Sequence, residues 1–111
     1  MATSKIPAQH KVETLYTNTT YRNDIGKKLT LSDDISEYES LRVAVYGTAI
    51  GGTHRSFISI NLGHISSISG QFPISCNAVL GAVRLSFASN ELQVLSSSYS
   101  ALCVGEVVGM K

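Results

Sequence analysis

Hydrophobic and polar residues alternate along several short stretches of the chain, as they do in β-strands with one buried face. In residues 40–47, for example, Leu41, Val43 and Val45 would share one face. Residues 63–73 show a weaker pattern, and their Gly and Pro residues predict turns. No stretch sustains a helical period. Strands are predicted at residues 11–17, 26–31, 40–47, 54–62, 78–88, 91–96 and 102–108.

The most closely specified element is a hairpin over residues 78–96. Its two-residue turn would be formed by Ser89 and Asn90, because Asn tolerates a positive φ. A shift of one residue would move every apolar side chain to the polar face, so the pattern and the turn must agree. The turn pairs Ala88 with Glu91, Phe87 with Leu92 and Leu85 with Val94. The apolar face then carries Val83, Leu85, Phe87, Leu92 and Val94, and the polar face carries Arg84, Ser86, Glu91 and Gln93.

The predicted strand at residues 102–108 differs from the others because it is apolar on both faces. We therefore expect a sheet to cover one side of it and a partner chain to cover the other. Further small or apolar side chains lie opposite the core face of their strand, namely Leu80, Ala82 and Ala88. Homo-oligomers usually have closed symmetry, and these second faces would be buried in such an assembly.

Seven or eight short strands, with turns at regular spacing, indicate an all-β protein. We predict an antiparallel β-sandwich, jelly-roll-like, that forms a single domain over residues 12–111. A chain of 111 residues has the length of one domain. Residues 1–11 are polar and aperiodic, and we interpret them as a flexible N-terminal tail or the end of a stalk.

A cluster of four carboxylates precedes the strand at residues 40–47 and raises the question of a catalytic or metal site. We interpret it as a solvated turn, capped by Ser32, in which Ile35 and Tyr38 fold inward. A Ca²⁺ loop would need oxygen ligands at alternating positions and usually a glycine. A glycosidase would need two carboxylates that face each other across a cleft. The four residues are Asp33, Asp34, Glu37 and Glu39.

Charge and composition argue against two classes of function. Nine Lys and Arg against eight Asp and Glu leave a formal charge of +1, so we expect no nucleic-acid partner. No apolar run approaches the roughly 18 residues of a membrane span, so no membrane insertion is expected. The first residues lack the apolar segment of a signal peptide. We therefore expect synthesis in a cytosol, where Cys76 and Cys103 would remain free thiols.

Candidate catalytic chemistry is sparse. His54 and His64 could bind a metal only together with a third ligand, which the sequence does not offer. No serine stands in a G-x-S-x-G context, and the glycine-rich stretch at residues 47–53 lacks the lysine of a phosphate loop. We therefore predict no catalytic residue, no metal site, no cofactor and no enzymatic activity.

Two segments resemble a known family. The sequence TLYTNTTYRNDIGKKLTLSDDISEYESLRVAVYG, residues 14–47, is similar to the opening of phage tail-fibre and receptor-binding-protein head domains. In those domains a strand near "LY" leads to an "ITL" stretch, then to a tyrosine and a strand that ends in a tyrosine and a glycine. They also tend to finish on a short apolar strand with a glycine near its end, as VGEVVGMK at residues 104–111 does. The resemblance covers residues 14–111 in outline.

The resemblance implies a homotrimeric β-sandwich at the tip of a fibre, which binds a host-surface glycan or protein during adsorption. It places the protein in the virion, at the tail fibre or tail tip beside other tail proteins, after synthesis in the host cytoplasm. No coiled-coil or β-helical stem is evident, so we expect a distal fragment or a small stand-alone protein. The alternative is a structural virion trimer, a capsid decoration (cement) or tail-assembly protein that has no host ligand.

Receptor-binding residues are expected in loops, because loops on a rigid scaffold often carry recognition. Two loops have suitable side chains, at residues 18–24 and 47–55. Tyrosine rings could stack on sugars, whereas arginine and histidine could donate directional hydrogen bonds. Of the five tyrosines, Tyr38 and Tyr46 are predicted to be packed. The candidate receptor-binding residues are Tyr21, Arg22, His54, Arg55 and Tyr99.

Overall fold

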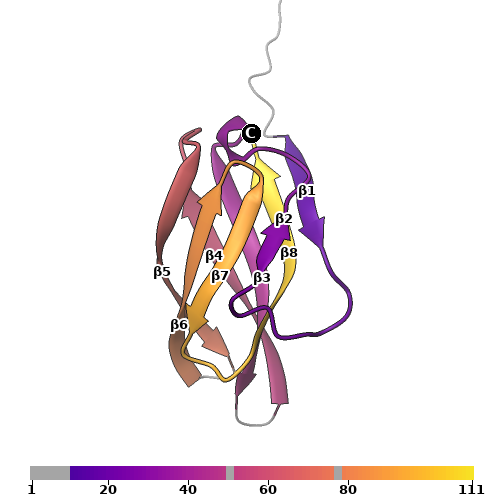
Figure 1. Ribbon diagram of the computed structural model, residues 1–111, viewed down its shortest axis with the longest axis vertical. Coiled ribbons are helices and arrows are strands. Elements are labelled where there is room, and N and C mark those ends of the chain that lie inside the picture. Colours follow the sequence, from indigo (N-terminus) through magenta and orange to yellow (C-terminus); the bar gives the residue numbers. More distant parts are fainter. Residues whose placement is uncertain (1–10, 50–51, 77–78) are drawn as a thin grey trace, which may run out of the picture.

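The computed structural model describes residues 11–49, 52–76 and 79–111, so the predicted tail falls outside the described residues apart from Lys11. The described chain forms strands with a single short 3-10 helix, as Figure 1 shows. Their bounds are β1 (Val12–Thr17), β2 (Lys28–Thr30), η1 (Ile35–Glu37), β3 (Ser40–Ala49), β4 (Gly52–Asn61), β5 (Ser67–Cys76), β6 (Val79–Ala88), β7 (Glu91–Ser97) and β8 (Leu102–Met110).

The strands form two antiparallel four-stranded sheets that pack face to face, which confirms the predicted all-β sandwich. One sheet has the order β1-β8-β3-β4 and is called the terminal sheet here, because it contains the first and the last strand. The other has the order β2-β7-β6-β5 and is called the meander sheet. The outer strands roll together as in a jelly roll, with β1 beside β8 and β2 beside β7, whereas β3–β4 and β5–β6–β7 are local hairpins.

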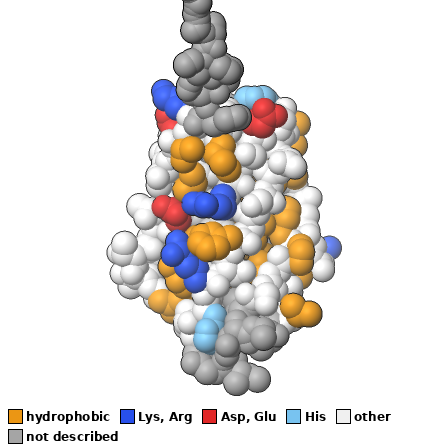
Figure 2. All heavy atoms as spheres, turned by 180° about the vertical axis from the view of Figure 1, so that it is seen from behind, with side chains coloured by type: hydrophobic (Ala, Val, Ile, Leu, Met, Phe, Trp, Pro, Cys, Tyr) orange, Lys and Arg blue, Asp and Glu red, His pale blue; other side chains and the backbone are white. Residues whose placement is uncertain are grey.

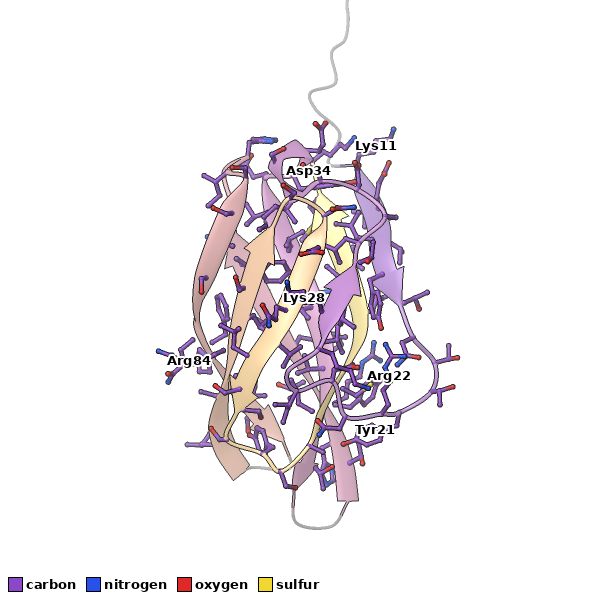
Figure 3. All side chains as sticks on the ribbon, viewed as in Figure 1. Lys11, Tyr21, Arg22, Lys28, Asp34 and Arg84 are labelled. Carbon is purple, nitrogen blue, oxygen red and sulfur yellow. The ribbon has the colours of Figure 1, made fainter. Side chains whose placement is uncertain are left out.

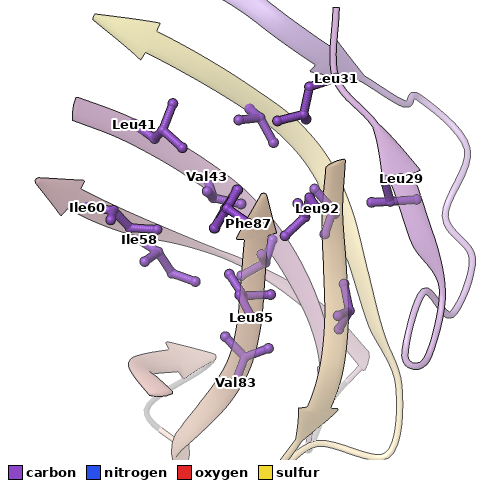
Figure 4. Packing of buried hydrophobic residues seen from close by; sticks show 14 of the residues in the cluster. Leu29, Leu31, Leu41, Val43, Ile58, Ile60, Val83, Leu85, Phe87 and Leu92 are labelled. Carbon is purple, nitrogen blue, oxygen red and sulfur yellow. The ribbon is translucent and has the colours of Figure 1, made fainter. Parts of the chain in front are cut away.

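The core lies between the two sheets and is made of alternate residues of their strands. Figure 4 shows Leu41 and Val43 of β3 on one side of it, with Leu85 and Phe87 of β6 on the other. All four are at most 1% exposed. Burial of each such side chain stabilises the fold by about 1.5–3 kcal/mol. The period-two pattern of the sequence therefore identifies the core face of these strands correctly.

The β6–β7 hairpin has the register predicted from the sequence. Phe87 lies opposite Leu92, and Leu85 lies opposite Val94. One detail differs, because the positive φ falls on Ser89 (54°) and not on Asn90. A two-residue turn with a positive φ at its first position still matches the twist of the two strands.

The prediction of turns over residues 63–73 is wrong for most of that stretch, because β5 runs without a break through Gly70 and Pro73. β5 lies at the edge of the meander sheet and pairs only with β6. A proline lacks a backbone N–H, and an edge strand has one side on which no such donor is needed. Pro73 is therefore compatible with a strand at this position.

The acidic segment forms the 3-10 helix η1, with Ile35 and Tyr38 buried as predicted. Its cap is Asp34, whose carboxylate accepts a hydrogen bond from the Ser36 N–H at 3.0 Å. Ser32 was the predicted cap, but its hydroxyl instead donates to the Thr14 carbonyl at 3.4 Å. An aspartate one residue before the helix fits the ordinary capping geometry better.

The strand β8 is buried on both faces within its own chain, with Val104 and Val107 in the core between the sheets. On its outer face, Asn18 contacts the Cys103 thiol at 3.5 Å. The ring of Tyr46 lies so close to Gly105 that an added Cβ would come within 2.5 Å of it. Residues of the same chain therefore cover the outer face of β8, so its two-sided apolar character does not require a partner chain. The homotrimer itself stays a prediction.

Candidate binding groove

A groove of about 470 Å³ lies on the outer face of the terminal sheet. Its floor is formed by the outward-facing atoms of Ala44, Cys103 and Gly105. The segment 17–21 lines one side, and Arg55 lines the other. This hollow is called the Tyr21–Arg55 groove below. Its volume is within the range of sites that bind small molecules.

The loop between β1 and β2, which carries Tyr21, is fixed along β8 by backbone hydrogen bonds. The Asn18 N–H donates to the Gly105 carbonyl at 2.9 Å, and the Asp24 N–H donates to the Leu102 carbonyl at 2.7 Å. The Asn23 side-chain oxygen accepts from the Leu102 N–H at 3.2 Å. These bonds extend the pairing of β1 with β8, so the loop has a defined position beside the groove.

Arg22 was expected to contact a receptor, but its side chain is engaged within the chain. Its Nε donates to the buried Asp24 carboxylate at 2.7 Å, and its Nη2 donates to the Tyr16 hydroxyl at 2.7 Å. The hydrogen bond with Asp24 raises the pKa of Arg22. Asp24 also accepts from the Val104 N–H at 2.8 Å. Arg22 therefore helps to hold the loop on β8, and it does not line the groove.

Tyr21 presents its ring to solvent, and 43% of the residue is exposed. Its hydroxyl shares a hydrogen bond of 2.7 Å with the Thr48 hydroxyl at the far end of β3. Figure 3 shows Tyr21 in the loop on the side of the sandwich that carries the β3–β4 hairpin. The ring is thus held from both the backbone and the hydroxyl, as a recognition residue on a rigid loop would be.

Arg55 stands on the outer face of β4 between two aromatic rings. Its guanidinium carbon lies 4.7 Å from the centroid of Phe57 and 5.8 Å from that of Tyr46. Arg42 approaches the same Phe57 ring at 5.3 Å. Figure 2 shows basic, acidic and hydrophobic side chains side by side in the middle of this face. Cation–π contacts of this kind orient the guanidinium groups at the surface.

The remaining candidate residues do not line the groove. Tyr99 is not a surface contact residue, because it is only 6% exposed and its hydroxyl donates to the Ile74 carbonyl at 3.2 Å. His54 is half-buried and pairs with Gly47 across the β3–β4 hairpin. His64 follows the other end of β4 and contacts the Ser36 carbonyl. The two histidines therefore do not face each other.

Among the residues that line the groove, Tyr46 and Glu106 are two that the sequence analysis did not select as candidates. Tyr46 was predicted to be packed, yet its half-buried ring lines the groove. The alternation in residues 40–47 places it opposite the core residues, and this signal pointed to an outward position. Glu106 also lines the groove from β8. Its place in the groove depends on which strands lie beside β8, and the sequence does not specify this order.

The groove is lined by aromatic rings, hydroxyl groups, one guanidinium, one carboxylate and the Cys103 thiol, and these groups suit non-covalent binding. Burial raises the pKa of the Cys103 thiol in its floor, which favours the neutral form. The side chain of Cys76 lies outside the described residues. Within residues 11–49, 52–76 and 79–111, no three His, Cys, Asp or Glu residues gather as metal ligands would.

Comparisons with protein-family models and with curated proteins find no match to this chain. The resemblance to phage head domains therefore rests on the sequence segments at residues 14–47 and 104–111 alone. In the part of the chain that the structure describes, no helix is long and apolar enough to cross a membrane.

Proposed function

We propose that this chain is the head domain of a phage tail fibre or tail tip, which binds a host-surface glycan or protein during adsorption. The observation that carries the proposal is the Tyr21–Arg55 groove. It joins two residues that the sequence analysis selected from separate loops, and both line the same hollow. Tyr21 offers an aromatic surface and Arg55 offers hydrogen-bond donors. Binding sites for small polar ligands commonly combine such groups.

The position of the groove along the sandwich supports this proposal. Lys11 and Lys111 are hydrogen-bonded at one end of the molecule. The β3–β4 hairpin, which carries Thr48 and Thr53, lies at the opposite end, as Figure 1 shows. A carrier attached before Lys11 would leave the hairpin end pointing away from it. The half of the terminal sheet that contains the groove would then be the half nearer to the host surface.

A trimeric assembly, as the family resemblance implies, would strengthen attachment. Single exposed sites of this kind bind weakly, but linked copies can raise the overall affinity by about 10²–10⁴-fold. The virion, at its tail fibre or tail tip, is then the proposed location of the protein, beside other tail proteins.

The test compares the adsorption of two purified proteins to host cells. One is the parent protein, and the other is the double Tyr21→Ala, Arg55→Ala variant. Both side chains are exposed, so the variant should fold normally and lose cell binding. Arg84→Ala is the matched control, because Arg84 is exposed on the meander sheet and points away from the sandwich in Figure 3. Undiminished cell binding by the folded double variant would refute the proposed site.

A structural virion protein remains the second candidate, and one observation favours it. Leu80 at the start of β6 is 84% exposed, and it lines a second hollow with Phe57 and Pro73. Exposed apolar side chains of this kind commonly mark contacts between proteins. A cement or tail-assembly trimer should bind virions that lack it and should not bind host cells. A head domain should bind host cells through its groove.

A further inference from the structure

We propose that the Tyr21–Arg55 groove binds a neutral pyranose ring with adjacent hydroxyl groups. This inference rests on the proposed receptor-binding function of the same groove, and it specifies the chemical class of the ligand. Two observations carry it. One is an aromatic ring that is held in place and lines the groove together with small uncharged residues. The other is a pair of opposite charges that have no ion-pair partner among the described residues.

The apolar part of the groove fits the C–H face of a sugar ring. Ala44, Cys103 and Gly105 provide a floor without charge, and Tyr21 provides an exposed ring. The Tyr21 hydroxyl is bonded to Thr48 at 2.7 Å, and its loop is bonded to β8. Because the ring is already ordered, binding a ligand against it costs less conformational entropy.

The polar part of the groove is set by the register of three strands. Glu106 of β8 lies opposite Ala44 of β3, and Arg55 of β4 lies opposite Tyr46 of β3. The two charged residues are thus two strands apart, a separation of roughly 10 Å between strand axes. Among the described residues neither belongs to an ion pair, since the pairs found are Lys11–Glu13 and Arg22–Asp24.

This arrangement favours a neutral ligand over a charged one. A carboxylate can accept hydrogen bonds from two neighbouring hydroxyl groups, and a guanidinium can donate to hydroxyl or ring oxygens. A ligand with an anionic group would gain from Arg55 but would be repelled by Glu106, and a cationic ligand would meet the opposite problem. A polyhydroxyl ring satisfies both groups without adding a charge. Threonine hydroxyls at positions 17, 19 and 53 line the same groove and add further partners.

The experiment titrates the isotope-labelled protein with four probes and follows its backbone amide signals by NMR. Methyl glucopyranoside and methyl galactopyranoside are the neutral probes, and glucuronic acid and glucosamine are their charged counterparts. We expect at least one neutral probe to shift the amides of residues 17–21 and 103–106, with the charged counterparts binding more weakly. Stronger binding of either charged probe, or shifts that lie elsewhere, would overturn the inference.

Conservative variants identify the groups that make the contacts. Glu106→Gln and Arg55→Gln should each weaken binding of the neutral probe by about tenfold, since each loses a hydrogen bond to a charged group. Arg84→Gln, on the opposite sheet, should leave it unchanged. Glu106→Gln should also improve binding of glucuronic acid relative to the neutral probe. Equal affinities in all three variants would contradict the assignment.

Failure of this inference can be distinguished from failure of the proposed function. If no probe shifts the groove amides, and the double Tyr21→Ala, Arg55→Ala variant still loses adsorption to host cells, the groove binds a receptor of another chemical class. The pyranose inference is then overturned and the proposed function is retained. If the double variant adsorbs normally, the groove is not the receptor site.

Discussion

At the scale of single residues, tyrosines connect distant parts of the chain. Tyr38 is fully buried, and its hydroxyl donates to the Asp33 carboxylate at 2.9 Å and to the Glu13 carboxylate at 3.3 Å. An added Cβ on Gly109 would come within 2.6 Å of its ring. One side chain thus links η1, β1 and β8, so its substitution should affect several elements at once.

The Tyr38–Asp33 hydrogen bond should make stability depend on acid pH. The bond from Tyr38, followed by that from the Asp34 N–H, holds the pKa of Asp33 below its usual value of 3.8. A carboxyl with a lowered pKa stabilises the fold above its unfolded pKa, and this contribution is lost as pH falls through the folded pKa. Tyr38→Phe should therefore lose more stability near neutral pH than it loses well below pH 3.8.

Urea denaturation of both proteins across this pH range measures the difference. Glu37→Gln serves as the control, because it replaces an exposed carboxylate on the same turn and leaves the Tyr38–Asp33 hydrogen bond in place. A difference in free energy of unfolding between Tyr38→Phe and the parent protein that stays constant on acidification would show that Asp33 is not linked to Tyr38.

At high pH the dependence has the opposite direction, and stability falls as pH rises. Burial, then Asp33, raises the pKa of Tyr38, so the parent protein should lose stability as the phenol ionises in the unfolded chain.

At the scale of elements, pairing between strands fixes the register and determines which residues the backbone tolerates. The β6–β7 hairpin is defined by local residues, and its bulge between Arg84 and Leu85 does not disturb the core face. The edge strand β5 tolerates Pro73 because it pairs on one side only. A strand with one neighbour can therefore contain a proline, because one side of its backbone needs no N–H donor.

Substitutions in the β6–β7 hairpin should have very unequal effects. Phe87→Ala should lower the free energy of unfolding by about 3–5 kcal/mol, because Phe87 is 1% exposed and lies opposite Leu92. Glu91→Ala should change it by less than about 0.5 kcal/mol, because Glu91 is exposed beside the turn. Chemical denaturation gives both values. Similar losses for the two variants would contradict this packing.

At the scale of the whole molecule, one aliphatic side chain of the described residues stands out by its exposure. Leu80 is 84% exposed, whereas the residues at 102–105 and 107–109 of β8 are already buried within the chain. If the protein assembles as the proposed homotrimer, its contacts should use exposed side chains such as Leu80 and not the strand at residues 102–108.

Analytical ultracentrifugation at micromolar concentration tests the trimer. The parent protein should sediment as a trimer, and Leu80→Ser should shift it toward a monomer that remains folded, as circular dichroism can verify. Leu95→Ser is the matched control, because Leu95 is only 41% exposed and lies on β7. A parent protein that sediments as a monomer would refute the proposed assembly.

Most of the fold follows from local patterns, but the groove does not. The alternation in residues 40–47 identifies Leu41 and Val43 as core residues, because a period of two depends only on neighbouring positions. Burial of Tyr99 depends on Gly81, where an added Cβ would lie 2.9 Å from the tyrosine ring, and these residues are distant in sequence. The presence of Tyr21 and Arg55 on the same groove likewise depends on the order β1-β8-β3-β4. No local pattern contains this order.

The bonds between the β1–β2 loop and β8 have a consequence for synthesis. The loop is held by Leu102, Val104 and Gly105, which the ribosome adds about 80 residues after Asn23 and Asp24. A nascent chain that ends before these residues cannot order the loop, whatever the state of its other hairpins. Pairing of such distant segments is also slow to form. If the groove has the proposed receptor-binding function, this function should therefore appear only after translation has passed β8.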